Sequence, residues 1–126
     1  MIREVLAVGL GGAVGSILRF MLSTVMLAGY TFLGFPLGTF TVNALGSLII
    51  GILMAVLEDK TYTLIGIVGF CGGFTTFSTF SADTIKLLRV GDWSSASLYI
   101  IMSIVVCLIC TALGIWIGTT ITKLTA

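Results

Sequence analysis

Polar and aromatic side chains gather in one stretch of an otherwise apolar sequence, residues 69–81. The stretch GFCGGFTTFSTFS carries three glycines and five hydroxyl side chains among thirteen residues. Glycine tolerates non-helical dihedral angles, and hydroxyl groups can bond backbone groups that leave a helix. The stretch therefore predicts a helix break around Gly72 to Thr76. Such a break exposes carbonyl groups that can hold a small cation and a helix N-terminus that favours an anion, so the predicted chemistry is ion binding.

Two phenylalanines follow the predicted break. Phe77 and Phe80 are three residues apart, which places them on nearly the same helix face. They could face lipid, or their electropositive ring edges could contact a small, hard anion. The interleaved Ser78 and Thr79 favour an inward-facing wall, and together with Thr76 they would bond either backbone groups near the break or the anion.

Two polar residues lie inside other apolar stretches. Asn43 needs a partner there: it either bonds across to a neighbouring helix or donates its amide hydrogens to a passing anion. Arg19 lies near the far end of the first apolar stretch, where it either attracts anions or extends its side chain to the lipid headgroups. The sequence leaves both pairs of alternatives open.

A mostly polar stripe runs along the last apolar stretch at spacings of four residues. Its members are Tyr99, Ser103, Cys107 and Thr111. Residues at this spacing share one slowly drifting helix face. The stripe could join neighbouring helices by hydrogen bonds, or it could line a pathway together with Asn43. Packing is the expected role of the three cysteines, Cys71, Cys107 and Cys110.

The elements that must position these residues are apolar helices. Of the 126 residues, 58% are apolar and only 9% are charged, which is typical of a protein dissolved in a bilayer. A spanning helix needs about 20 apolar residues, and the uncharged stretches give four of them, at about 2–27, 37–57, 62–88 and 94–122. We expect an all-α membrane protein with a single four-helix transmembrane domain over residues 1–126, its third helix broken in mid-membrane.

Several function classes are disfavoured by what the sequence lacks. It has no histidine, the commonest acid–base side chain at neutral pH, so we do not expect an enzyme. A net charge of +1 without a basic run gives no electrostatic footprint for nucleic acid. The carboxylates all lie at or near expected helix ends, at Glu4, Glu58, Asp59, Asp83 and Asp92. A pathway through the membrane interior would therefore suit an anion better than a cation.

The basic residues are almost evenly divided between the two membrane faces. Arg3, Lys60 and Lys123 flank one face, and Lys86 and Arg89, joined by the deeper Arg19, flank the other. Orientation normally follows an excess of lysine and arginine on the cytoplasmic side, so the chain is expected to insert in both directions. Because four helices leave little room for a pathway within one subunit, we expect an antiparallel, dual-topology homodimer.

Three segments of the chain, residues 11–20, 38–46 and 69–81, resemble the signature stretches of the fluoride channels of the Fluc (CrcB) family. The resemblance extends over all four expected helices. It implies a passive, fluoride-selective channel in the cell inner membrane that exports fluoride from the cytoplasm and so relieves its toxicity. The rival hypothesis is a small antiparallel four-helix transporter of another substrate.

The resemblance also implies roles for individual residues. Two pores would run along the dimer interface, and matching places Asn43, Phe77, Phe80, Tyr99 and Ser103 along them. Ser78, Thr79 and Arg19 are further candidate pathway residues. Cys107 departs from the family pattern, which usually has a hydroxyl there. A structural sodium ion would lie at the dimer axis, held by the backbone carbonyls of Gly72 and Thr75.

Overall fold

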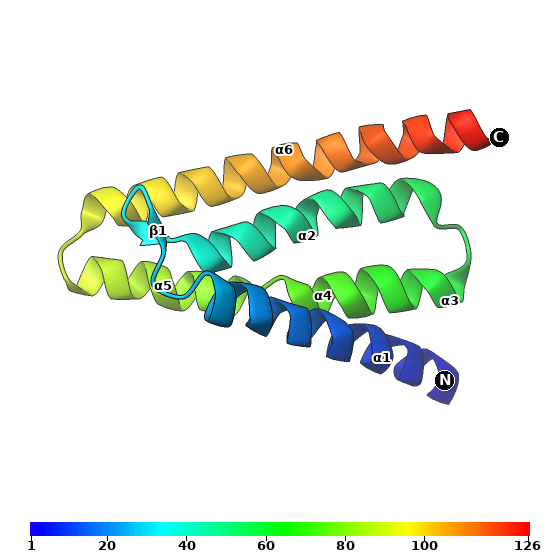
Figure 1. Cartoon of the computed structure of the whole chain (residues 1–126), viewed down its shortest axis with the longest axis horizontal. Helices are drawn as coiled ribbons and strands as arrows, with labels where there is room; N and C mark the ends of the chain where they lie inside the picture. Colours follow the sequence, from blue (N-terminus) through cyan, green and yellow to red (C-terminus); the bar gives the residue numbers. More distant parts are fainter.

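The computed structural model describes all residues 1–126, and four long helices dominate it (Figure 1). The helices long and apolar enough to cross a membrane are Ile2–Met26, Leu37–Val56, Lys60–Arg89 and Trp93–Thr125. They confirm the prediction of an all-helical membrane protein with four spans. Both termini lie at the same end of the bundle (Figure 1), as an even number of spans requires.

The first two spans are joined by a short hairpin that was not expected from the sequence. The first span consists of α1 (Ile2–Arg19) and the wider π-helical turns of η1 (Phe20–Met26). Strands β1 (Thr31–Phe32) and β2 (Phe35–Pro36) then pair antiparallel. Leu33 and Gly34 between them have φ values of 52° and 86°. Two positive φ angles in a two-residue loop are the mark of a type I′ hairpin turn.

The bundle is built from two closely packed helix pairs. One pair is α1 with the first half of the third span, which comprises α3 (Lys60–Thr63), η2 (Leu64–Cys71) and α4 (Gly72–Phe74). The other pair is α2 (Leu37–Val56) with α6 (Trp93–Thr125). The second half of the third span is α5 (Phe77–Arg89).

Glycines bring the backbones of each helix pair into direct contact. A Cβ at Gly69 would stand 2.6 Å from the carbonyl oxygen of Val8 on α1. A Cβ at Gly114 on α6 would collide with the Leu48 carbonyl of α2. Small residues at such crossings replace side-chain packing by backbone contact, which is the usual way for helices to associate in lipid.

The third span is broken, but over a shorter segment than the sequence predicts. Thr75 (φ −90°, ψ 157°) and Thr76 (φ −149°, ψ 109°) are extended, whereas Gly72 is helical (φ −62°, ψ −37°). The adjacent Gly73 packs against α1, because its Cβ would lie 2.6 Å from the Gly12 carbonyl oxygen. Thus Gly73 serves close approach between helices, and the threonines supply the non-helical backbone.

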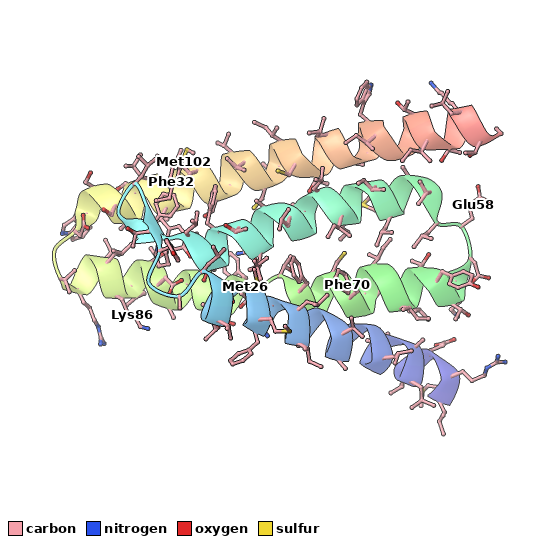
Figure 2. All side chains as sticks on the ribbon, viewed as in Figure 1. Met26, Phe32, Glu58, Phe70, Lys86 and Met102 are labelled. Atoms are coloured by element: carbon pink, nitrogen blue, oxygen red, sulfur yellow. The ribbon has the colours of Figure 1, made fainter.

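Large apolar side chains point outward along most of the bundle (Figure 2). Only 19 of 126 residues are buried within the chain, so the apolar surface is left for lipid or a partner subunit. Most charged side chains lie near the ends of the bundle, where Asp59 and Asp92 accept hydrogen bonds from the first turns of α3 and α6. An exposed ion pair of 2.7 Å between Lys60 Nζ and Glu4 Oε1 joins the third span to α1.

The close approach at Gly69 generates a prediction about stability. Gly69→Ala should force α1 away from the third span, at a cost of about 1 to 3 kcal/mol for overpacking. The measurement is the melting temperature of the purified protein in detergent. Gly9→Ala is the control, since nothing lies within 4 Å of its Cβ position. Equal melting temperatures for the two variants would contradict the assigned helix contact.

Candidate functional site

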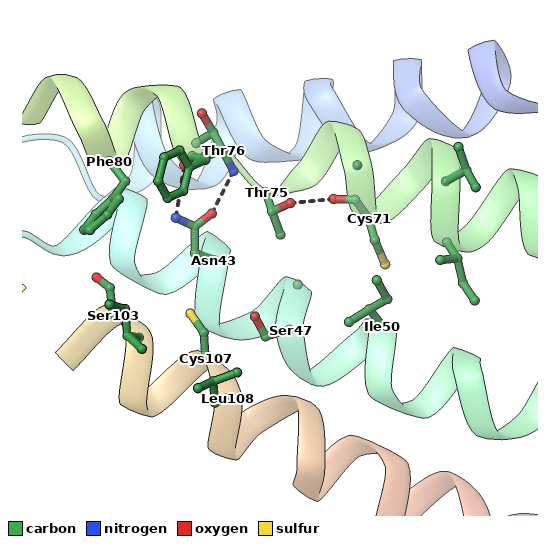
Figure 3. A pocket seen from close by; sticks show the side chains of 16 residues that line it. Asn43, Ser47, Ile50, Cys71, Thr75, Thr76, Phe80, Ser103, Cys107 and Leu108 are labelled. Atoms are coloured by element: carbon green, nitrogen blue, oxygen red, sulfur yellow. Dashed lines mark hydrogen bonds between the residues drawn. The ribbon is translucent and has the colours of Figure 1, made fainter. Parts of the chain in front are cut away.

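A groove of about 650 Å³ opens in mid-bundle beside the helix break (Figure 3). We call it the central groove; α2, the third span and α6 form its walls. Four of the predicted pathway residues line it, namely Asn43, Phe77, Phe80 and Ser103. Gly72 and Thr75, the predicted sodium ligands, line it too, as does Cys107. Arg19, Ser78, Thr79 and Tyr99 are not among its lining residues.

The side chain of Asn43 pairs with both backbone groups of Thr76. Its Oδ1 accepts from the Thr76 N–H at 2.7 Å, and its Nδ2 donates to the Thr76 carbonyl at 3.1 Å (Figure 3). The amide thus replaces the helical partners that Thr76 lacks in its extended conformation. Of the two roles that the sequence left open, this contact is the bond to a neighbouring helix.

The two threonines of the break use their hydroxyls differently. Thr75 Oγ1 and the Thr75 N–H both donate to the Cys71 carbonyl, at 2.8 and 3.0 Å, which finishes the first half-helix. Thr76 Oγ1 accepts from the Thr79 N–H at 3.2 Å and so caps α5. It also lies 3.1 Å from Thr79 Oγ1 and 3.3 Å from Ser78 Oγ. Ser78 and Thr79 therefore belong to an exposed hydroxyl cluster at the start of α5.

Backbone oxygen atoms at the break remain without a hydrogen-bond partner, among them that of Thr75. No hydrogen bond within the chain reaches the carbonyl of Thr75. Nearby Gly72 is exposed, and nothing lies within 4 Å of its Cβ position. The break therefore offers an unpaired backbone oxygen at Thr75 and open space at Gly72.

Arg19 approaches the break from the side of α1. Its Nε donates to the Gly73 carbonyl at 2.8 Å. The guanidinium therefore stabilises an oxygen at the end of the first half-helix, where the helix dipole favours a positive charge. Neither alternative that the sequence offered included this contact between α1 and the broken helix.

The predicted aromatic residues form a contiguous wall. The rings of Phe77 and Phe80 lie 5.6 Å apart between centroids, and Phe77 is 78% exposed. Phe80 meets Tyr99 edge-on at 4.8 Å and 70°. Tyr99 is fully buried and donates from its hydroxyl to Asp83 Oδ2 at 3.0 Å. Tyr99 therefore lies behind Phe80 instead of facing the groove.

The polar stripe of α6 serves two purposes in the structure. Ser103 Oγ is the one buried side-chain nitrogen or oxygen atom without a hydrogen-bond partner, and Ser103 lines the central groove. Thr111 Oγ1 instead donates to the Ser47 carbonyl of α2 at 3.1 Å. Ser103 and Cys107 of the stripe therefore line the groove, and Thr111 joins two helices.

Two residues near the site were missed by the sequence analysis. Asp83 was assigned to a helix end, yet it is the partner of Tyr99. Its position three residues after Phe80 on one helix could have indicated a shared face. Ser47 lines the groove one turn after Asn43, and the same periodicity could have revealed it.

Comparisons with known proteins identify the family. A family model described as CrcB-like protein, Camphor Resistance (CrcB), matches residues 6–115. The chain belongs to this family. A CrcB relative from Azobacteroides pseudotrichonymphae is 40% identical over 110 residues, covering 83% of this chain and 87% of the relative. A relative from Hydrogenovibrio crunogenus is 41% identical over 122 residues, covering 93% and 92% of the two chains.

A third CrcB relative, from Geobacter metallireducens, is 41% identical over 116 residues, covering 88% of this chain and 93% of the relative. All three relatives bear the name Fluoride-specific ion channel FluC. The resemblance stated from the three sequence segments is thereby confirmed. The family is one of ion channels, so this multi-pass membrane protein is not an enzyme.

The pairing of Asn43 with Thr76 generates a second prediction. Asn43→Leu should leave two backbone groups unpaired in a low-dielectric site, at a cost of about 1 to 3 kcal/mol for each buried group. Thermal unfolding in detergent measures the loss. Ser47→Ala is the matched control, because Ser47 lies one turn away in the same groove and its hydroxyl bonds no backbone group of the break. A control that melts as early as Asn43→Leu would refute the special role of the pairing.

Proposed function

We propose that this chain forms a passive, fluoride-selective channel that exports fluoride from the cytoplasm across the cell inner membrane. The observation that carries the proposal is Ser103 Oγ, a buried and unpartnered hydroxyl in the same groove as Phe77 and Phe80. A small anion leaving water needs donors to replace its hydration. A free hydroxyl and positive ring edges supply them. The names of the CrcB relatives support the same ion.

The charge distribution of the groove supports an anion and a passive mechanism. Its lining contains no aspartate, glutamate, lysine or arginine. No acidic side chain in the lining therefore repels fluoride, and no basic side chain in the lining traps it. A conducting site must bind its ion weakly enough to release it. Flow then follows the fluoride gradient, outward when the cytoplasm holds the higher concentration.

In this proposal fluoride contacts the four predicted pathway residues that line the central groove. Phe77 and Phe80 form one wall on α5, and Ser103 faces them from α6. Asn43 has both amide groups engaged with Thr76; its second Nδ2 hydrogen remains as a donor. In this proposal Tyr99, Ser78, Thr79 and Arg19 act around the pathway: Tyr99 behind Phe80, the hydroxyls at the start of α5, and Arg19 as a nearby positive charge.

The functional unit in this proposal is an antiparallel homodimer with two pores. The central groove is open on one side, where Phe77 and Gly72 are exposed. A second, inverted copy would close it, and the two-fold axis would generate an equivalent groove in the partner. The even distribution of basic residues over both faces supports dual insertion. A C-terminal reporter found on only one side of the membrane would contradict it.

A structural sodium ion at the dimer axis fits the residues present. The unpaired Thr75 carbonyl and the open space at Gly72 are compatible with an oxygen-ligated cation. The Gly72 and Thr75 carbonyls of both subunits would together supply the oxygen ligands of the ion. Bound there, sodium would supply positive charge between carbonyl dipoles that otherwise repel one another.

Ion efflux from liposomes tests the proposed function. Liposomes with the purified protein should release fluoride rapidly and chloride slowly when a potassium shunt balances charge. Ser103→Ala should slow fluoride efflux by about tenfold or more, because a hydrogen bond to a charged group contributes about 1.5 to 3 kcal/mol. Thr120→Ala is the control, since that hydroxyl bonds only its own helix, at Trp116. Folded protein without fluoride flux would rule out the channel.

Replacement of sodium tests the proposed cation. Exchange of sodium for N-methylglucamine should lower the melting temperature of the detergent-solubilised dimer, since a ligand bound only by the folded state stabilises it. The shift should grow with sodium concentration. A melting temperature independent of sodium would contradict the assignment of Gly72 and Thr75.

A further inference from the structure

The hairpin between the first two spans packs directly on the start of α6. A Cβ at Gly34 would collide with Ser95 Oγ, so the turn leaves no gap above this helix. Ser95 is itself fixed, because its N–H donates to the capping carboxylate of Asp92 at 3.1 Å. The hairpin and the first turn of α6 therefore form one packed unit.

Phe35 of β2 extends from this unit into the bundle. It is completely buried and stacks on Tyr99, with ring centroids 4.9 Å apart and planes at 17°. Ser95 and Tyr99 are four residues apart on one face of α6, so the hairpin covers both. On its other side, Tyr99 meets Phe80 edge-on at 4.8 Å. An unbroken series of aromatic contacts thus leads from the hairpin to the groove wall.

Other contacts hold the first two members of this series, Phe35 and Tyr99. Phe35 also packs against Phe40 of α2, with centroids 5.3 Å apart. The hydroxyl of Tyr99 is held by Asp83 at 3.0 Å. Tyr99 is therefore held both at its ring face, by Phe35, and at its hydroxyl, by Asp83.

We infer that Phe35 is a positioning residue of the channel: through Tyr99 it holds the Phe80 ring in its orientation at the central groove. The inference rests on the proposed function. Phe35 does not line the groove, so it acts on the ion only through the ring that does. Without the stacking partner, Tyr99 and Phe80 gain rotational freedom. The ring edge then points at the groove for only part of the time.

The test compares three variants of the full chain in liposomes. Phe35→Leu removes the ring, and Phe35→Met removes it while filling much of its volume with a flexible side chain. Both should lower the ratio of fluoride to chloride efflux by about two- to tenfold, the range expected for the loss of one aromatic contact. Phe32→Leu is the control. Phe32 lies in the same hairpin and contacts Phe35 and Phe40, but no aromatic contact joins it to Tyr99.

A second comparison separates positioning from general loosening of the fold. In a Phe80→Ile background there is no ring left to orient, so adding Phe35→Met should change the efflux ratio no further. Additive losses would overturn the inference, as would an unchanged ratio in folded Phe35→Met. Failure of the unmodified protein to release fluoride would instead overturn the proposed function. If Phe35→Leu does not fold, Phe35→Met alone decides the matter.

Discussion

The pairing of one amide side chain with one stretch of unwound backbone underlies the whole arrangement. A helix break inside a membrane exposes N–H and C=O groups that water does not reach, at a cost of several kcal/mol for each group. Asn43 satisfies both groups of Thr76. Arg19 and the Thr75 hydroxyl bond neighbouring carbonyls. Only because these bonds exist can two threonines remain extended in mid-bundle and open a polar space there.

The same pairing joins the two halves of the bundle. Glycine contacts unite α1 with the third span and α2 with α6, and a close contact of Gly46 with Thr75 also joins the two pairs. Asn43 belongs to α2 and Thr76 to the third span, so their hydrogen bonds fix one pair against the other. The groove lies beside this junction. Its shape therefore depends on polar bonds, while the strength of each pair comes from backbone packing.

Hydropathy was enough to predict the four spans, because the bilayer imposes length and apolarity on every one. The break was also predicted, but the glycines suggested a longer one. The sequence does not distinguish a glycine that allows non-helical dihedral angles from one that allows a neighbouring helix to approach closely. Gly73 allows close approach. Spacing could place Asp83 on the face of Phe80, but its pairing with Tyr99, like that of Thr76 with Asn43, could not be read from the sequence, because periodicity defines a helix face without saying what lies opposite. The hairpin strands have two residues each, which is too short for the alternation of apolar and polar residues that would predict a strand.

The bond between Thr111 and the Ser47 carbonyl has a consequence for protons. A chain of hydroxyl groups conducts protons when every member can turn and pass a hydrogen to the next. The Thr111 hydroxyl is committed to a backbone oxygen, and the thiol of Cys107 before it is a weak donor and acceptor. The row of polar groups along α6 is thus interrupted below Ser103. An anion that crossed the bundle here would therefore have no continuous, proton-conducting row of hydroxyl groups beside it. Such a row would dissipate the proton gradient across the membrane.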